Sequence, residues 1–205
     1  MISTAEQLIQ ASKSGDVVKA RELFSDGAVA ACRDAKGWSP LVWASFGGHD
    51  EMVALLLQHG ADSDYRKERD EIEAAVRAEE AKVNGLSVRI DTDSSYTKPV
   101  TINSPLHWAS FKGNLRVVWQ LLLHGFSVSD IDENGNNALH LACTGGHADV
   151  VRTLMQQGFE VDLRNGFGVD AICLSTSPAV HALLNKAIAQ EQCPVSRRCT
   201  YTDKF

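Results

Sequence analysis

The chain of 205 residues has no excess of positive charge, because 20 Lys and Arg residues stand against 26 Asp and Glu residues and give a formal net charge of −6. This balance argues against a module that holds nucleic acid through a general positive field. The apolar runs are too short to span a bilayer. The N-terminus lacks the basic start and apolar stretch of a secretory signal. We therefore expect no nucleic-acid partner and no membrane insertion.

Cysteines are few, odd in number and unevenly spread, which does not indicate a disulfide framework. The five are Cys32, Cys143, Cys173, Cys193 and Cys199. Together with the missing signal, this usage favours a reducing intracellular compartment, the cytoplasm or the nucleus. The chain is 44% hydrophobic and 22% charged, near the globular average, so global disorder is not expected. Its length suits one ordinary domain or a short repeat array.

Motifs that carry chemistry are missing as well. No serine or cysteine stands in a motif that pairs it with a base, and no phosphate-binding glycine loop occurs. We therefore predict no catalytic residue, no cofactor, no bound metal and no small-molecule substrate. An enzyme is not expected within these residues.

An internal repeat is the strongest positive feature of the chain. Similar segments read Gly-Trp-Ser-Pro-Leu-Val-Trp-Ala from Gly37, Asn-Ser-Pro-Leu-His-Trp-Ala from Asn103 and Gly-Asn-Asn-Ala-Leu-His-Leu-Ala from Gly135. A degraded copy begins at Gly168. The first three copies are each followed by a second apolar segment that ends in glycine, of the type Leu-Leu-Leu-Gln-His-Gly. Repetition of this kind predicts a stacked repeat architecture.

The spacing of the copies reveals one interruption. Pro105, Ala138 and Ala171 follow one another at equal intervals, and this interval is the period of the repeat. Pro40 precedes Pro105 by nearly two such periods, although the two prolines belong to consecutive copies. An insertion almost one period long, at 67–98, therefore falls between the second and third units.

Each unit carries the start and end signals of two short helices. Ser39 and Ser104 can cap the first helix, with Pro40 and Pro105 in its first turn. Glycines stand where the two helices must end, at Gly48, Gly113 and Gly146 for the first and at Gly60, Gly125 and Gly158 for the second. Apolar residues recur between these stops at helical spacing. Such a helix pair exposes an apolar face and becomes stable when it stacks on a neighbour.

The pattern resembles the ankyrin repeat over roughly residues 4–66 and 99–190, through Ser-Pro-Leu-His-Trp-Ala, Gly-His and Leu-Leu-Leu-x-His-Gly. The resemblance implies an all-α repeat solenoid of stacked helix-turn-helix units, with inter-repeat β-hairpin loops and a concave face of inner helices and hairpin tips. We predict one ankyrin-repeat domain over residues 1–190, whose first and last units depart from the pattern and resemble caps. Its five repeats lie at about 4–33, 34–66, 99–131, 132–164 and 165–190.

Two segments stand outside the repeats. The insertion at 67–98 reads as an elongated inter-repeat hairpin with a helical elaboration, and a mobile charged loop is the alternative. The tail at 191–205 has no apolar periodicity, and we predict that it is disordered.

Most of the seven histidines recur at fixed positions of the unit, as His49 and His147 do. Such recurrence favours a structural role, by local hydrogen bonds to the turn backbone of each histidine's own unit, over a role as ligand or general base. Cys143 and Cys173 fall on helix-core columns and read as small buried hydrophobes.

The aromatic residues divide into two groups. Trp43 and Trp108 occupy a column that holds leucine in the next unit, so we predict that they lie in the core. Trp38, Phe46 and Phe111 occupy columns that hold polar residues in other units, which predicts exposure. In the alternative, the two phenylalanines pack on one another as an extension of the core. Exposed aromatic clusters are typical of interface centres.

These observations predict a scaffold or adaptor, present as a monomer, that binds a protein or peptide on the concave face. The predicted contacts combine apolar anchors with polar side chains on the same columns: Trp38, Phe46, Phe111, Lys112, Asn136, Thr144 and Phe167. Two alternatives stay open. Similarity to short ankyrin arrays that inhibit cyclin-dependent kinases suggests an inhibitor of a partner enzyme such as a kinase, and the tail suggests the targeting module of a larger enzyme or membrane protein.

Acidic residues gather near the junction of the third and fourth units. They are Asp130, Asp132 and Glu133, with Glu160 and Asp162 one unit later. A solvated rim is the expected role. A role in binding would favour a partner segment that carries Lys or Arg beside its apolar anchors.

Overall fold

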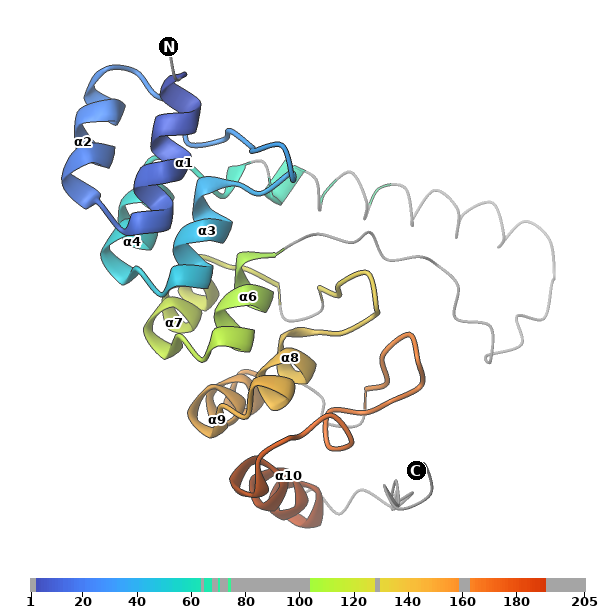
Figure 1. Cartoon of the computed structure of the whole chain (residues 1–205). Coiled ribbons are helices and arrows are strands. Elements are labelled where there is room, and N and C mark those ends of the chain that lie inside the picture. The colour runs from blue at the N-terminus through green and yellow to red at the C-terminus, as the bar shows by residue number, and fades with distance from the viewer. Residues whose placement is uncertain are drawn as a thin grey trace, which may run out of the picture.

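The computed structural model describes residues 3–63, 65–67, 70, 74, 104–127, 130–158 and 163–190. Nine α-helices have both ends within these ranges, and further helical residues stand at 63, 65–67, 70 and 74 (Figure 1). The described residues contain no extended strand, and their one isolated antiparallel bridge joins Arg164 and Asp170. The predictions for the insertion at 67–98 fall outside the described residues except at three positions. The prediction for the tail at 191–205 falls wholly outside them.

Eight of the described helices form antiparallel pairs. The pairs are α1 (Thr4–Ser14) with α2 (Val17–Ser25), α3 (Pro40–Gly47) with α4 (Asp50–Gln58), α6 (Pro105–Lys112) with α7 (Leu115–Leu123), and α8 (Ala138–Gly145) with α9 (Ala148–Gln156). A single helix, α10 (Pro178–Gln190), follows.

The pairs stack into two rows. The inner row is α1, α3, α6 and α8, each in contact with the next, and the outer row is α2, α4, α7 and α9 (Figure 1). Helix α3 contacts α6 directly, so the insertion between them leaves the stack unbroken. The predicted all-α repeat solenoid is confirmed.

The helix ends follow from local backbone chemistry. The Ser39 Oγ accepts a hydrogen bond of 3.3 Å from the N–H of Val42, and Ser104 caps α6 in an equivalent way. Gly48 and Gly113 end α3 and α6 with φ of 74° and 76°, in the left-handed region. The predicted starts and ends of these inner helices are therefore confirmed.

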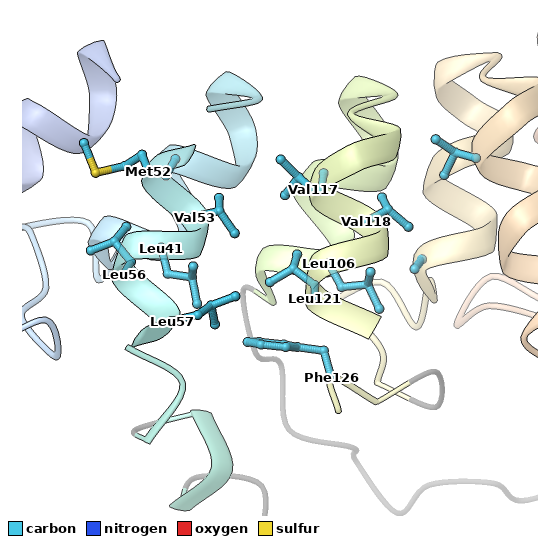
Figure 2. Close-up of a cluster of buried hydrophobic side chains, with 14 of the residues drawn as sticks. Leu41, Met52, Val53, Leu56, Leu57, Leu106, Val117, Val118, Leu121 and Phe126 are labelled. Carbon is cyan, nitrogen blue, oxygen red and sulfur yellow. The ribbon is translucent and has the colours of Figure 1, made fainter. Parts of the chain in front are cut away.

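The core lies between the two rows and runs the length of the stack. Leu41 and Leu106 enter it from the inner row, and Leu56, Val118 and Leu121 enter it from the outer row (Figure 2). Each of these side chains is at most 1% exposed. Burial of one such leucine contributes about 2 kcal/mol, so each unit depends on its neighbours for most of its stability.

The described loops between units are tight turns whose β-pairing is limited to the Arg164–Asp170 bridge around the last of them, so the predicted hairpins have no extended strands. In one of them the Asp132 N–H donates to the Asn136 carbonyl at 2.8 Å. The Asp132 carboxylate also accepts from the N–H groups of Asn134 and Asn136, at 2.8 Å each. The same turn closes at 34–38 and 165–169. The side chain of the first turn residue accepts the hydrogen bonds of the turn's N–H groups, so these groups need no partner strand. No strand extends into the described parts of these loops.

The fifth unit lacks the first helix that the repeat predicts. Residues 171–174 form a turn in which the Asp170 carboxylate accepts from the Cys173 N–H at 2.9 Å. The chain then runs through Ser-Thr-Ser to Pro178, which begins α10 against α9. This unit has no Ser-Pro-Leu start, and proline disfavours helical backbone in the residue before it.

The two cysteines predicted as buried hydrophobes differ in their surroundings. Cys143 is fully buried as a free thiol, and burial raises its pKa to about 12, so that prediction is confirmed. Cys173 lies half-buried in the turn before α10 and is disulfide-bonded. The prediction for Cys173 is wrong because the helix that would have buried it does not form.

Candidate functional site

Five aromatic rings gather where the second unit meets the third. The Trp38 ring centroid lies 4.5 Å from that of Trp43 and 4.8 Å from that of Trp108. The Trp108 ring is in turn 5.6 Å from Phe46 and 6.2 Å from Phe111. These separations are those of favourable tilted and edge-to-face pairs. We call these five residues the aromatic cluster.

The repeat itself places the rings together. Trp43 and Phe46 are three residues apart on α3, and Trp108 and Phe111 are three residues apart on α6, so each pair projects from one side of its helix. The other residues in the first two turns of each helix are buried, so the rings occupy its less buried side. All five rings are half-buried. The cluster therefore lies on the surface formed by the inner helices and the inter-unit turns, which we call the inner face.

The prediction that Trp43 and Trp108 lie in the core is wrong, because both are half-buried. The Trp43 indole N–H donates to Asp34 Oδ2 at 2.9 Å, a partner that a buried leucine column does not supply. Burial acts to raise the pKa of Asp34, but hydrogen bonds from the Trp38 N–H and the Trp43 indole, with the charge of Lys13, leave it below its ordinary value. The inter-unit turn thus fixes the indole at the edge of the cluster.

Two lysines lie over the rings. Lys13 Nζ is 4.2 Å from the Trp43 ring centroid, and Lys112 Nζ is 4.4 Å from that of Phe46 and 5.8 Å from that of Phe111. These distances place each ammonium within the range of cation–π attraction. Lys112 was a predicted contact and Lys13 was not. Lys13 occupies the same position of its unit as Phe46 and Phe111 do in theirs, and this was the sequence feature that could have identified it as a contact.

The predicted contact Asn136 has a structural task. Its amide nitrogen donates to Asp132 Oδ2 at 3.0 Å, and its amide oxygen accepts from Asn165 Nδ2 at 2.8 Å. Both ends of the amide therefore hold one turn to the next. The side chain is engaged before any partner arrives.

The remaining predicted contacts take no part in the ring contacts of the aromatic cluster. Thr144 is half-buried at the end of α8, and its hydroxyl donates to the His140 carbonyl at 3.0 Å. Phe167 is 72% exposed on the last inter-unit turn and makes no ring contact with another described aromatic residue. The structure thus brings together Trp38, Phe46, Phe111 and Lys112, whereas Asn136, Thr144 and Phe167 make none of the ring or cation–π contacts of the cluster.

The histidine columns join neighbouring units. His49 Nε2 lies 3.1 Å from the Lys13 carbonyl, and His147 Nε2 lies 3.0 Å from the Phe111 carbonyl. In the third unit Asn114 takes this position and donates to the end of α3 at 2.8 Å. The structural role predicted for these histidines fits these contacts, but each bonds the preceding unit rather than its own. Among the described residues no group of three His, Cys, Asp or Glu side chains is placed to hold a metal.

A second cluster ties the end of the second unit to the third. The Tyr65 hydroxyl donates to Asp130 Oδ2 and accepts from the Ser127 N–H at 3.2 Å. The Tyr65 ring stacks on Phe126, with centroids 4.4 Å apart. Burial raises the pKa of Asp130 to about 7.

This cluster also corrects the predicted solvated acidic rim. Asp130 is bound by a tyrosine and Asp132 holds its own turn, so Glu133 is the exposed member of the first group. Glu160 and Asp162 lie outside the described residues.

We expect Asp130→Asn to remove part of the pH dependence of stability. The folded chain keeps this carboxyl protonated up to about pH 7, whereas the ordinary value is 3.8. Stability from this group is therefore complete below about pH 4 and declines as the pH rises to about 7. The full shift corresponds to about 4 kcal/mol, and partial exposure reduces this to about 1–2 kcal/mol.

Urea unfolding at about pH 5 and about pH 8 measures this effect. The asparagine keeps an oxygen for the Tyr65 hydroxyl, so the variant should gain stability relative to the wild type at the higher pH. Asp149→Asn is the control, because Asp149 is exposed on α9. Parallel pH profiles for the wild type and Asp130→Asn would contradict the prediction.

Comparison with known proteins identifies the repeat. A family model described as ankyrin repeats (3 copies) matches residues 5–70 and 72–165. The chain is 26% identical over 150 residues to a transient receptor potential cation channel subfamily A member 1 homolog of Caenorhabditis elegans, covering 73% of this chain and 12% of that protein. It is 44% identical over 68 residues to a 2-5A-dependent ribonuclease of Mus musculus, covering 33% and 9%.

A plant relative matches over more of the chain. The E3 ubiquitin-protein ligase XBAT33 of Arabidopsis thaliana is 25% identical over 189 residues, covering 91% of this chain and 31% of that protein. The chain thus spans less than a third of each of these three relatives. None of the described helices has the length and apolarity to cross a membrane.

Proposed function

Because the chain belongs to the ankyrin-repeat family, whose repeats serve as protein–protein interaction modules, we propose that it is a scaffold or adaptor that binds a partner protein or peptide on its inner face. The aromatic cluster is the observation that carries the proposal. Its five half-buried rings present apolar area that a partner can remove from water. Aromatic side chains held rigidly by their neighbours are typical energetic centres of interfaces.

The test is a double substitution at the cluster. We expect Phe46→Ala with Phe111→Ala to weaken partner binding by about 2 kcal/mol, or about 30-fold, because two aromatic anchors are lost. The partner is first identified by affinity capture with the full chain, and the purified pair is then measured by isothermal titration calorimetry. Leu123→Ala is the matched control, since Leu123 is 80% exposed on the outer helix α7.

Circular dichroism establishes that each variant keeps its helices, since both phenylalanines are half-buried. Unchanged affinity in a folded Phe46→Ala and Phe111→Ala chain would refute this placement of the site. Equal weakening by Leu123→Ala would point to the outer row instead.

A second candidate is that these repeats are the targeting module of a longer protein. The observation in its favour is the small share, 9% to 31%, of the three relatives that the chain spans. Sequencing of the complete transcript tests it, and a reading frame that ends at residue 205 would contradict it. Inhibition of a partner enzyme such as a kinase stays a prediction, and it requires a folded catalytic partner whose activity falls on binding.

A further inference from the structure

The charges around the aromatic cluster specify what kind of segment it fits. We propose that the inner face binds an acidic partner segment, in which carboxylate side chains flank aromatic or aliphatic anchors. This proposal rests on the proposed function. The anchors cover the five rings, and the carboxylates pair with Lys13 and Lys112. The proposal rests on where these ammonium groups lie and on how the nearby acidic groups are used.

The ammonium groups already occupy the cation positions over the rings. Lys13 Nζ lies over Trp43 at 4.2 Å, and Lys112 Nζ lies over Phe46 at 4.4 Å. A cationic partner side chain that approached these faces would meet a like charge at close range. Among the described residues neither ammonium takes part in an ion pair within 4.0 Å. Both are therefore available to pair with incoming carboxylates.

Asp34, the acidic group on which the charge of Lys13 acts, is held by hydrogen bonds within the fold. Asp34 accepts from the Trp43 indole at 2.9 Å and from the N–H groups of Lys36 and Trp38, also at 2.9 Å. The same turn carries Arg33 and Lys36 as exposed residues. Two positive side chains, Lys13 and Lys112, thus lie over the cluster, although the whole chain carries a net charge of −6. This local reversal of sign is the electrostatic complement of an acidic segment.

The acidic residues at the junction of the third and fourth units do not alter the preference for an acidic partner segment. Asp132 is bonded to its own turn and to Asn136, and Asp130 is bonded to Tyr65. Glu133 alone of that group is exposed. Among the described residues of that group, a partner rich in Lys or Arg would therefore find one exposed acidic side chain, and it would meet repulsion from Lys13 and Lys112 at the cluster itself.

Selection from a random peptide library displayed on phage, with peptides of about 12 residues, tests the proposal without a known partner. The full wild-type chain is the bait, and a counter-selection uses the Phe46→Ala and Phe111→Ala chain to discard peptides that bind elsewhere. We expect the remaining peptides to combine a net negative charge with aromatic or aliphatic residues. Their affinity should fall at least about tenfold for Lys13→Glu with Lys112→Glu. Lys186→Glu, on α10, is the matched control and should change affinity less than about twofold.

The outcomes separate this inference from the proposed function. Peptides that depend on the phenylalanines but are neutral or basic, and that tolerate the double charge reversal, would overturn the acidic partner and leave inner-face binding intact. No enrichment over the phenylalanine-deficient chain would overturn both. Selection with the charge-reversed chain as bait should instead enrich basic peptides, and a persistent acidic preference there would also contradict the proposal.

Discussion

Replacing Leu121 with alanine is expected to lower the free energy of unfolding by about 3 kcal/mol. Leu123→Ala, two residues further along the same helix, should change it by less than about 0.5 kcal/mol. Leu121 is 0% exposed and Leu123 is 80% exposed, so the pair differs in burial and not in residue type or helix.

The size of the effect follows from where Leu121 lies. It belongs to the buried core that runs through the stack, and Leu57, Leu106 and Phe126 are among the core residues drawn around it (Figure 2). Truncation removes contacts within the third unit and leaves a cavity that the two rows of helices cannot fully close. Because each unit is stable through its neighbours, the loss is transmitted to the units on both sides.

Urea unfolding followed by circular dichroism gives both free energies. A broadened transition in Leu121→Ala, relative to Leu123→Ala, would indicate that the second and fourth units have begun to unfold separately. Equal losses in the two variants would show that α7 does not pack as described.

The helix pairs could be predicted because their signals are local. Ser39, Ser104 and the glycines at Gly48 and Gly113 act on the backbone within one turn of where they stand. The copies repeat these signals at a constant interval, and the interruption shows as a departure from that interval. Such features need no knowledge of tertiary packing.

The surroundings of the tryptophans depend on tertiary packing and could not be predicted in the same way. Leucine in an equivalent position pointed to the core, but an indole has an N–H that needs an acceptor. Asp34 supplies that acceptor from a turn nine residues earlier, and the ring settles half-buried beside it. Asp132 occupies the position of Asp34 in the next described turn and also accepts from the turn backbone. The recurrence of aspartate therefore points to the turn, but it does not reveal that Asp34 also accepts from an indole.

Periodicity reveals that a residue has a repeated role without revealing which unit it serves. His49 and His147 recur in register, yet each bonds a carbonyl 36 residues earlier, in the preceding unit. The Tyr65–Asp130 contact lies outside any period, since it joins residues 65 positions apart across the insertion. The predicted site therefore included three of the rings that gather, Trp38, Phe46 and Phe111, but it left out Trp43 and Trp108 and the charge of Lys13.

A second large loss of stability is expected for Gly135→Ala, about 3 kcal/mol, against about 1 kcal/mol for Gly168→Ala. The two glycines occupy the same position of two inter-unit turns, and both have φ of 73°. Any residue with a β-carbon bears the cost of this left-handed backbone, which sets the loss at Gly168. The additional loss at Gly135 comes from its neighbour in space.

That neighbour is the next turn of the stack. A β-carbon at Gly135 would lie 2.4 Å from the backbone nitrogen of Gly166, whereas one at Gly168 meets nothing within 4 Å. The Gly166 N–H donates to the Asn134 carbonyl at 2.8 Å, so relief of the clash breaks the bond that joins the two turns. The Asn136–Asn165 side-chain bond beside it is strained by the same movement.

Urea unfolding of the two variants measures the difference, and hydrogen exchange at the Gly166 amide locates it. Exchange at this amide should accelerate in Gly135→Ala and stay slow in Gly168→Ala, because only the first substitution separates the turns. If both substitutions cost about 1 kcal/mol and leave this amide protected, the turns do not stack on one another in solution. In that case the hydrogen bonds that join Asn134 and Asn136 to the last turn would not persist in solution, and the inner face would be less rigid around the fourth unit.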